Sequence, residues 1–161
     1  MATPGNPTAL YLDDLSVGDT FTSATHQLDV DQVRRFASEF DPQPFHLDED
    51  AARHSLFQGL AASGWHTVAI TMRLLVDSMP LADGVIGAGA EISWARPTRP
   101  GDALHVKSTI LSITPSRSKP DRGIVLVESV TFNQDGDEVQ KLTSKAVSYT
   151  HLRAHETPEH L

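Results

Sequence analysis

The first clear pattern of apolar positions along the chain has the spacing of an amphipathic helix. A one-sided stripe, with intervals of three, three, one and three, is formed by Val30, Val33, Phe36, Ala37 and Phe40. Asp29 can cap its start, with Gln32 as the return partner of a capping box. Pro42 and Pro44 end it, because neither donates a backbone hydrogen bond. The pattern predicts a helix over residues 30–40, and the residues before it, Thr22 to Leu28, predict a short strand.

A second apolar segment, Gly64 to Val76, lacks a polar face. Its apolar members are Trp65, Val68, Ala69, Ile70, Met72, Leu74, Leu75 and Val76, and its first charged residue is Arg73. Such a segment predicts a helix that is buried on every side, with Ser63 as its N-cap. A shorter helix is predicted before it, from Asp48 to Phe57, because the acidic residues at its start favour the positive end of a helix dipole.

The rest of the chain has the pattern of strands separated by turns. The predicted strands are Val85 to Arg96, Leu104 to Ile113, Ile124 to Asn133, and Val139 to Val147. The pair Asp135-Gly136 between the last two is a strong hairpin signal, and Pro97 to Asp102 is typical of a turn. We therefore expect an α+β domain in which consecutive hairpins build an antiparallel sheet that curls around the apolar helix.

Composition narrows the class of protein. The 161 residues carry 13 Lys and Arg against 21 Asp and Glu, a net charge of −8, which argues against a nucleic-acid binder. The absence of cysteine excludes disulfide scaffolds, thiolate zinc sites and cysteine nucleophiles. No stretch approaches the ~20 apolar residues of a membrane span. The first residues have neither the basic cluster nor the apolar run of a signal peptide, so we expect a cytoplasmic protein.

The two ends of the chain differ in pattern from the single domain expected over residues 11–147. Residues 1–10 are predicted to be a loose arm. Residues 148–161 lack apolar periodicity and resemble translated adaptor sequence, so we expect them to contribute nothing to function. A metal site there would need His151 and His155, one helical turn apart, to converge, whereas a solvated end is the simpler interpretation.

The first candidate for chemistry is the segment Asp41-Pro42-Gln43-Pro44-Phe45-His46. Two prolines around a glutamine predict a rigid loop that holds a carboxylate and an imidazole at its ends. If Asp41 and His46 turn toward one point, they can position and deprotonate a water molecule. The alternative is structural: Asp41 accepts nearby backbone N–H groups, and His46 merely lies near the start of the next helix.

The second candidate is the segment Ala61-Ala62-Ser63-Gly64-Trp65-His66, where the apolar helix begins. Small residues leave room for a ligand to approach N–H groups that have no intrahelical partner. Such groups can stabilise the oxyanion of a thioester carbonyl. The alternative is close packing, with Gly64 required by a neighbouring group. Trp94, on a predicted strand, is interpreted as a core or interface aromatic.

These motifs and the order of elements resemble the MaoC-like dehydratase family, which includes (R)-specific enoyl-CoA hydratases. The family signature has an Asp, an Asn-Pro pair, a His, a short helix, and a Gly at the head of the central helix. Asp41, Pro44, His46 and Gly64 occupy the matching positions, and the resemblance extends over residues 11–146. It implies the hotdog fold, in which an antiparallel sheet wraps around one long helix, and a homodimer.

The resemblance also implies a role for individual residues. Asp41 and His46 would hold the water that adds to Cβ of an enoyl thioester, or would protonate the leaving hydroxyl group, while the Gly64 N–H would bind the thioester oxygen. Residues around them are implied as substrate contacts: Gln43, Phe45, Ser63, Trp65 and His66. Three of these depart from the family pattern, because Gln43 replaces an Asn, Phe45 an aliphatic residue and Ser63 a His.

The expected function is a hydratase or dehydratase acting on an acyl-CoA or acyl carrier protein thioester, without a metal or another cofactor. Two other functions stay open on the sequence alone. A hotdog thioesterase takes a carboxylate from the central helix, but residues 64–76 contain none, and Asp77 lies at the far end. A non-catalytic module that binds acyl thioesters is compatible with Gln43 in place of Asn.

Overall fold

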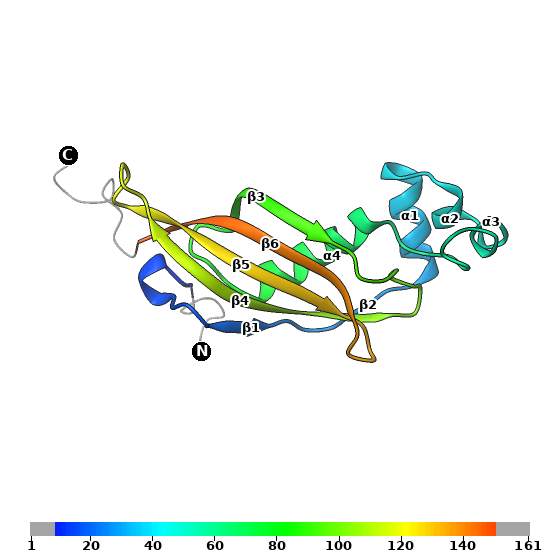
Figure 1. Cartoon of the computed structure of the whole chain (residues 1–161), viewed down its shortest axis with the longest axis horizontal. Helices are drawn as coiled ribbons and strands as arrows, with labels where there is room; N and C mark the ends of the chain where they lie inside the picture. The colour runs from blue at the N-terminus through cyan, green and yellow to red at the C-terminus, as the bar shows by residue number, and fades with distance from the viewer. Residues whose placement is uncertain (1–8, 151–161) are drawn as a thin grey trace.

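The computed structural model describes residues 9–150, which form one long, curved sheet with a helix along one face (Figure 1). In chain order the elements are a 3-10 helix (Leu12–Asp14), β1 (Thr20–Thr22), β2 (His26–Gln27), α1 (Val30–Phe40), α2 (Pro44–Leu47), α3 (Glu49–Arg53), α4 (Gly64–Ser78), β3 (Ile86–Ser93), β4 (Ala103–Pro115), β5 (Arg122–Phe132) and β6 (Glu138–Tyr149). Helices α1, α2 and α3 gather at one end of the sheet. The α+β hotdog arrangement expected from the sequence is confirmed.

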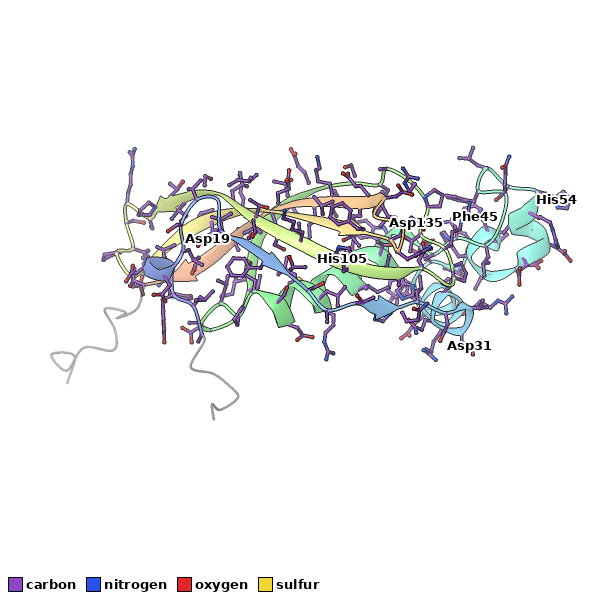
Figure 2. The ribbon with its side chains drawn as sticks, turned by 90° about the horizontal axis from the view of Figure 1, so that it is seen from below. Asp19, Asp31, Phe45, His54, His105 and Asp135 are labelled. Atoms are coloured by element: carbon purple, nitrogen blue, oxygen red, sulfur yellow. The ribbon has the colours of Figure 1, made fainter. Side chains whose placement is uncertain are left out.

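The sheet is antiparallel, but its strand order differs from a chain of consecutive hairpins. Strands β4, β5 and β6 follow one another, and the β5–β6 turn contains Gly136 with φ of 78°, as the Asp135-Gly136 signal predicted. Strand β3, however, pairs with β6 rather than with β4. The expected β3–β4 hairpin is wrong, because residues 94–102 are long enough to carry the chain across the end of the sheet. This connection and the turn at Asp135 lie at the same end as Phe45 (Figure 2).

Three predicted boundaries need correction. The single strand expected over residues 22–28 is two short strands, because the hydroxyl of Ser23 accepts the Val106 N–H in place of a backbone carbonyl. The helix expected from Asp48 to Phe57 begins at Glu49, with the Asp48 side chain as its N-cap, and ends at Arg53. The proline-bounded loop contains the one-turn helix α2, with Pro44 in its first turn.

Helix α4 begins where the sequence places it, with the Ser63 hydroxyl accepting the Trp65 N–H at 3.2 Å. Only one of its faces packs on the sheet within the chain, and that face includes Thr67, Ile70, Thr71, Leu74 and Leu75. The opposite face exposes the apolar residues Trp65, Ala69, Met72 and Val76. The expectation that the sheet covers the helix on every side is therefore wrong for a single chain.

The core between α4 and the sheet contains a buried polar layer between two apolar clusters. On β4, Ser108 lies between Val106 of one cluster and Ile110 of the other. Its hydroxyl is hydrogen-bonded to that of Ser129 at 2.8 Å. A second set of buried bonds joins Thr71 of α4 to Thr131 at 2.6 Å and to Gln140 at 2.9 Å. Because each group is paired, the layer fixes the register of α4 on the sheet without leaving buried polar atoms unsatisfied.

The packed domain extends slightly beyond the predicted limits of residues 11 and 147. Leu10 donates its N–H to the Pro80 carbonyl at 2.8 Å, and β6 continues to Tyr149, opposite Arg122. Residues 1–8 and 151–161 lie outside the described part, and with them the candidate histidines of the C-terminal segment. Within residues 9–150, no helix has the length and apolar character needed to cross a membrane.

Candidate active site

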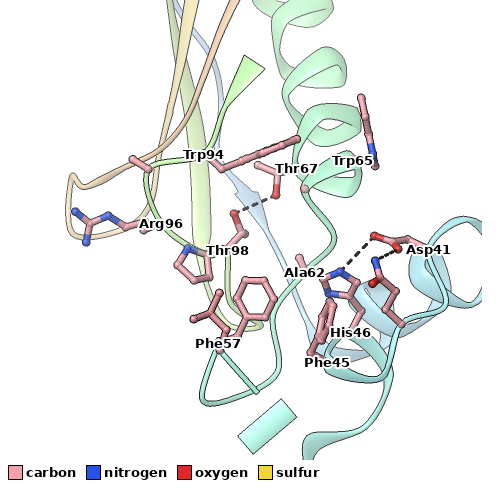
Figure 3. A pocket seen from close by; sticks show the side chains of 15 residues that line it. Asp41, Phe45, His46, Phe57, Ala62, Trp65, Thr67, Trp94, Arg96 and Thr98 are labelled. Atoms are coloured by element: carbon pink, nitrogen blue, oxygen red, sulfur yellow. Dashed lines mark hydrogen bonds and ion pairs between the residues drawn. The ribbon is translucent and has the colours of Figure 1, made fainter. Parts of the chain in front are cut away.

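A cavity of about 610 Å³ opens at the end of the sheet where the short helices pack (Figure 3). Its walls are formed by Asp41, Gln43, Phe45 and His46, by Leu56 and Phe57, by Ala62, Gly64, Trp65 and Thr67, and by Trp94, Ala95, Arg96, Pro97 and Thr98. Both segments singled out from the sequence, one that runs into α2 and one at the start of α4, thus meet at one cavity. The long connection between β3 and β4 supplies the facing wall.

The acid and the imidazole of the first segment are in direct contact. His46 Nε2 lies 3.3 Å from Asp41 Oδ2, and His46 Nδ1 lies 2.6 Å from the Ala61 carbonyl oxygen. The separation is shorter than the 5–6 Å expected for two groups that are bridged end to end by one water (~2.6–3.2 Å per hydrogen bond). A water that contacts both groups would form a triangle with them.

The contacts of His46 restrict its protonation. A carbonyl oxygen only accepts hydrogen bonds, so the Ala61 contact requires a proton on Nδ1. Nε2, the other ring nitrogen, faces Asp41 Oδ2. With protons on both nitrogens, the imidazolium donates to both of its partners and forms an ion pair with the carboxylate.

Asp41 is held in its ionised form by its neighbours. Burial alone raises the pKa of this carboxyl, but hydrogen bonds from Ser63 and Gln43 and the facing His46 outweigh burial, so the pKa lies below its usual value. The Gln43 side-chain amide donates to Asp41 Oδ1 at 2.5 Å. Gln43, the departure from the family pattern, therefore orients one carboxylate oxygen and leaves the other toward His46.

Local backbone bonds explain why the segment folds this way. The Gln43 N–H donates to the Asp41 carbonyl, and the His46 N–H donates to the Gln43 carbonyl at 3.0 Å. Pro44 suits the first turn of α2, where no N–H is needed. These bonds turn the chain through one tight helical turn, which places Asp41 and His46 side by side at its two ends.

The head of α4 approaches Trp94 closely. A Cβ atom at Gly64 would lie 2.7 Å from Cε2 and Cζ2 of the Trp94 indole, so only glycine fits. The indole is fixed in turn by a hydrogen bond from its Nε1 to Gln140 Oε1 at 3.0 Å. The Gly64 N–H belongs to the first turn of the helix, where backbone donors have no partner one turn earlier. Gly64 and Trp65, the first two residues of α4, both line the cavity.

Of the predicted site residues, six line the cavity, one lies behind its wall, and one, His66, lies elsewhere. Asp41, Gln43, Phe45, His46, Gly64 and Trp65 line the cavity. Ser63 is fully buried behind them, and its side-chain hydrogen bond lowers the pKa of Asp41.

His66, expected as a substrate contact, does not line the cavity. Its ring is stacked on Phe36 of α1, with centroids 4.6 Å apart, and its Nδ1 has no partner. Burial, with nearby His26 and Arg35, lowers the pKa of His66 to about 4. The expectation for His66 is wrong because helical periodicity turns this residue toward α1, about 100° away from Trp65.

Several cavity residues were not identified from the sequence. Trp94, interpreted from the sequence as a core or interface aromatic, is part of the cavity wall. Thr98 is also part of the wall, and its hydroxyl accepts a hydrogen bond from the Thr67 hydroxyl at 3.0 Å. Leu56 and Phe57 reach the cavity from the segment after α3. These residues come from connections whose course depends on strand order, so no local pattern could place them. Within residues 9–150, no group of three or more His, Asp or Glu side chains is arranged to hold a metal ion.

Comparison with known proteins agrees with the fold. The model of the MaoC like domain matches residues 15–133. The chain is 35% identical over 128 residues to the uncharacterized protein YdeM of Bacillus subtilis, covering 78% of this chain and 89% of that protein. It is 25% identical to a 3-hydroxybutyryl-CoA dehydratase of Methylorubrum extorquens, covering 84% and 86%. A crystal structure of a MaoC-like dehydratase from Rhodospirillum rubrum shares 63% identity and a TM-score of 0.88, covering 89% of this chain and 99% of that one.

Proposed function

Because this chain belongs to the family of MaoC-like domains, we propose that it is a hydro-lyase that interconverts enoyl and 3-hydroxyacyl thioesters. The observation that carries the proposal is the contact of His46 Nε2 with an ionised Asp41 at a cavity wall that also holds the Gly64 N–H. The reaction has two requirements: an acid–base pair that activates water, and a hydrogen-bond donor that stabilises the carbonyl oxygen.

In hydration, Asp41 and His46 hold one water on the cavity side. The water gives a proton to the dyad while its oxygen bonds to Cβ of the enoyl group. The electrons of the C=C bond move toward the carbonyl, and the enolate oxygen accepts a hydrogen bond from the Gly64 N–H. The dyad then returns a proton to Cα, so one water is added and the dyad is restored. Dehydration is the same sequence reversed.

The proposed substrate carrier is coenzyme A or acyl carrier protein. The relative named as a 3-hydroxybutyryl-CoA dehydratase supports a CoA thioester. The apolar character of much of the cavity wall, with Phe45, Leu56, Phe57 and Trp94, suits an acyl group.

We also propose that the functional unit is a homodimer. Strand β3 ends the sheet with an open edge, and the exposed face of α4 is apolar. An open edge and an adjacent apolar face are typical of surfaces that pair with a second copy.

Turnover of crotonyl-CoA tests the proposal against its rivals. A hydratase removes the absorbance of the enoyl thioester and releases no thiol. A thioesterase releases free coenzyme A, but within residues 64–78 the one carboxylate, Asp77, is bonded to Arg73 at the far end of α4. Binding with neither change would indicate a non-catalytic module and would reject the proposed function.

A further inference from the structure

The turn cluster before β4 forms a rigid base beside the cavity. The Arg99 N–H donates to Asp102 Oδ2 at 2.8 Å, and Gly101 has φ of 97°, which favours glycine. Asp102 is buried, and its carbonyl accepts the Leu28 N–H at 2.9 Å. Gln134 donates to the other carboxylate oxygen at 3.1 Å. The backbone at Arg99 is therefore fixed from several sides.

From this base, the Arg99 guanidinium reaches the connection between α3 and α4. Its Nη1 donates to the Gly59 carbonyl at 2.9 Å and to the Leu60 carbonyl at 3.2 Å, and its Nη2 donates to the Phe57 carbonyl at 2.5 Å. Three carbonyls of one irregular segment thus converge on one side chain. The planar fork of arginine suits such an arrangement, and neither lysine nor glutamine can reproduce it.

The tethered segment carries apolar side chains into the cavity wall. The Phe57 ring lies 5.1 Å from that of Phe45 and 6.1 Å from the His46 imidazole, between ring centroids. Leu56, beside it at the cavity, is 93% exposed. An apolar side chain this exposed next to a cavity would gain burial when an apolar group occupies the cavity.

The Asp41–His46 pair is held separately from this tether. Ala61, which accepts the His46 hydrogen bond, donates its own N–H to the Phe45 carbonyl at 3.1 Å. Ala62 donates to the Thr98 carbonyl at 2.8 Å. Loss of the Arg99 fork would loosen residues 57–60, which would then be held by fewer bonds, such as that from the Gly59 N–H to the Ala52 carbonyl, while the bonds of Ala61 and Ala62 keep the dyad in place.

We propose that Arg99 is a positioning residue that holds Leu56 and Phe57 as the binding surface for the acyl chain of the substrate. The inference rests on the proposed function, because it takes an acyl thioester as the ligand. A four-carbon acyl group ends close to the dyad, whereas a longer chain extends past Phe57 toward Leu56. The contribution of Arg99 therefore grows with the length of the acyl chain.

The experiment compares Arg99→Gln with the control Arg53→Gln, since Arg53 is an exposed arginine of α3 that pairs with Asp50. Dissociation constants are measured for butyryl-CoA and octanoyl-CoA, and kcat is measured with crotonyl-CoA. In Arg99→Gln we expect octanoyl-CoA to bind about tenfold more weakly and butyryl-CoA to change by less than about threefold. The kcat should stay within about threefold, and residues 55–60 should exchange amide hydrogens faster. Arg53→Gln should change none of these quantities.

A second variant keeps the inference testable if Arg99→Gln does not fold. Leu56→Ser alters an exposed side chain and should weaken octanoyl-CoA binding selectively. An equal loss of affinity for both thioesters would indicate that the segment contacts the coenzyme A part of the ligand rather than its acyl chain, and would overturn the inference. Unchanged amide hydrogen exchange of residues 55–60 would overturn it too. Absence of crotonyl-CoA turnover by the unaltered protein would reject the proposed function alone, because the binding constants do not depend on turnover.

Discussion

At the scale of single residues, the site depends on keeping a partly buried carboxylate charged. Asp41 is ionised at neutral pH because Ser63, Gln43 and His46 together outweigh the effect of burial on its pKa. A carboxylate whose pKa is depressed in the folded state stabilises the fold above its ordinary pKa. That contribution is lost as the pH falls through the depressed value. Stabilisation by the Asp41 carboxylate is therefore complete at neutral pH.

The first prediction concerns the dyad. Asp41→Asn keeps the shape of the side chain but cannot take a proton, and His46→Ala removes the imidazole. Each should lower kcat for crotonyl-CoA by about 10²–10⁴-fold with a smaller change in KM, because binding uses other contacts. The double variant should be little worse than the poorer single variant, since both residues act on one water. Additive losses in steady-state kinetics would contradict a shared water.

The second prediction concerns the close approach at the head of α4. Gly64→Ala adds a Cβ that meets the Trp94 indole at 2.7 Å, so it should destabilise the protein by about 1–3 kcal/mol. Trp94→Leu in the same chain should remove most of that added cost, which a double-mutant cycle of urea unfolding measures as a coupling energy. Equal effects of Gly64→Ala with and without Trp94 would show that glycine is needed there for another reason.

The residues that could be predicted are those whose signal is local. Asp41 and His46 are five positions apart on a proline-bounded segment, and Gly64 follows its N-cap directly, so these local features and the family resemblance together indicated them. Trp94 and Thr98 were missed because they enter the cavity through strand order, which local patterns do not determine. The sequence shows which side chains Trp94 and Thr98 are, but it does not show which residues lie next to them in the fold.

At the scale of elements, the helices were predicted more closely than the strand connections. Proline, glycine and capping residues mark the ends of α1 and the start of α4, and these signals act within a few residues. The partner of β3 was predicted wrongly because the choice between β4 and β6 depends on contacts far apart in the chain. The contact between α1 and α4, made through Phe36 and His66, likewise carries no local signal.

The third prediction follows from that helix contact. The pKa of His66 is about 4 in the folded protein against 6.5 for an ordinary histidine, so the unfolded chain binds the proton first as the pH falls. The free energy of unfolding should therefore decrease between pH 6.5 and pH 4, by about 3 kcal/mol from this residue. His66→Phe, which keeps a ring on Phe36, should lose this part of the pH dependence.

The control for that measurement is His54, an exposed histidine at the end of α3. His54→Gln should leave the slope of unfolding free energy against pH unchanged. Urea unfolding at several pH values between 4 and 7 provides the slope for each variant. If His66→Phe retains the full slope of the unaltered protein, the buried neutral histidine is not its cause.

At the scale of the whole molecule, one apolar face of α4 is not covered by the rest of the described chain. The polar layer and two apolar clusters fill the space between α4 and the sheet, but the other face of α4 is apolar and uncovered. The sequence predicted a helix that is apolar on all sides, and a single chain covers only one of them. A second copy, placed against α4 and the open edge of β3, would supply the remaining cover.

The last prediction tests this proposed dimer. Light scattering should report a species of twice the 17.5 kDa chain mass at micromolar concentration. Met72 is 39% exposed on the uncovered face of α4, and Met72→Glu should shift the mass toward the monomer because a buried, unpaired carboxylate is costly at an interface. Leu111→Glu is the matched control, since Leu111 is 40% exposed on β4, outside both proposed contact regions. It should leave the dimer intact. A monomeric unaltered protein, or equal dissociation by both variants, would show that the uncovered face of α4 is not the dimer contact.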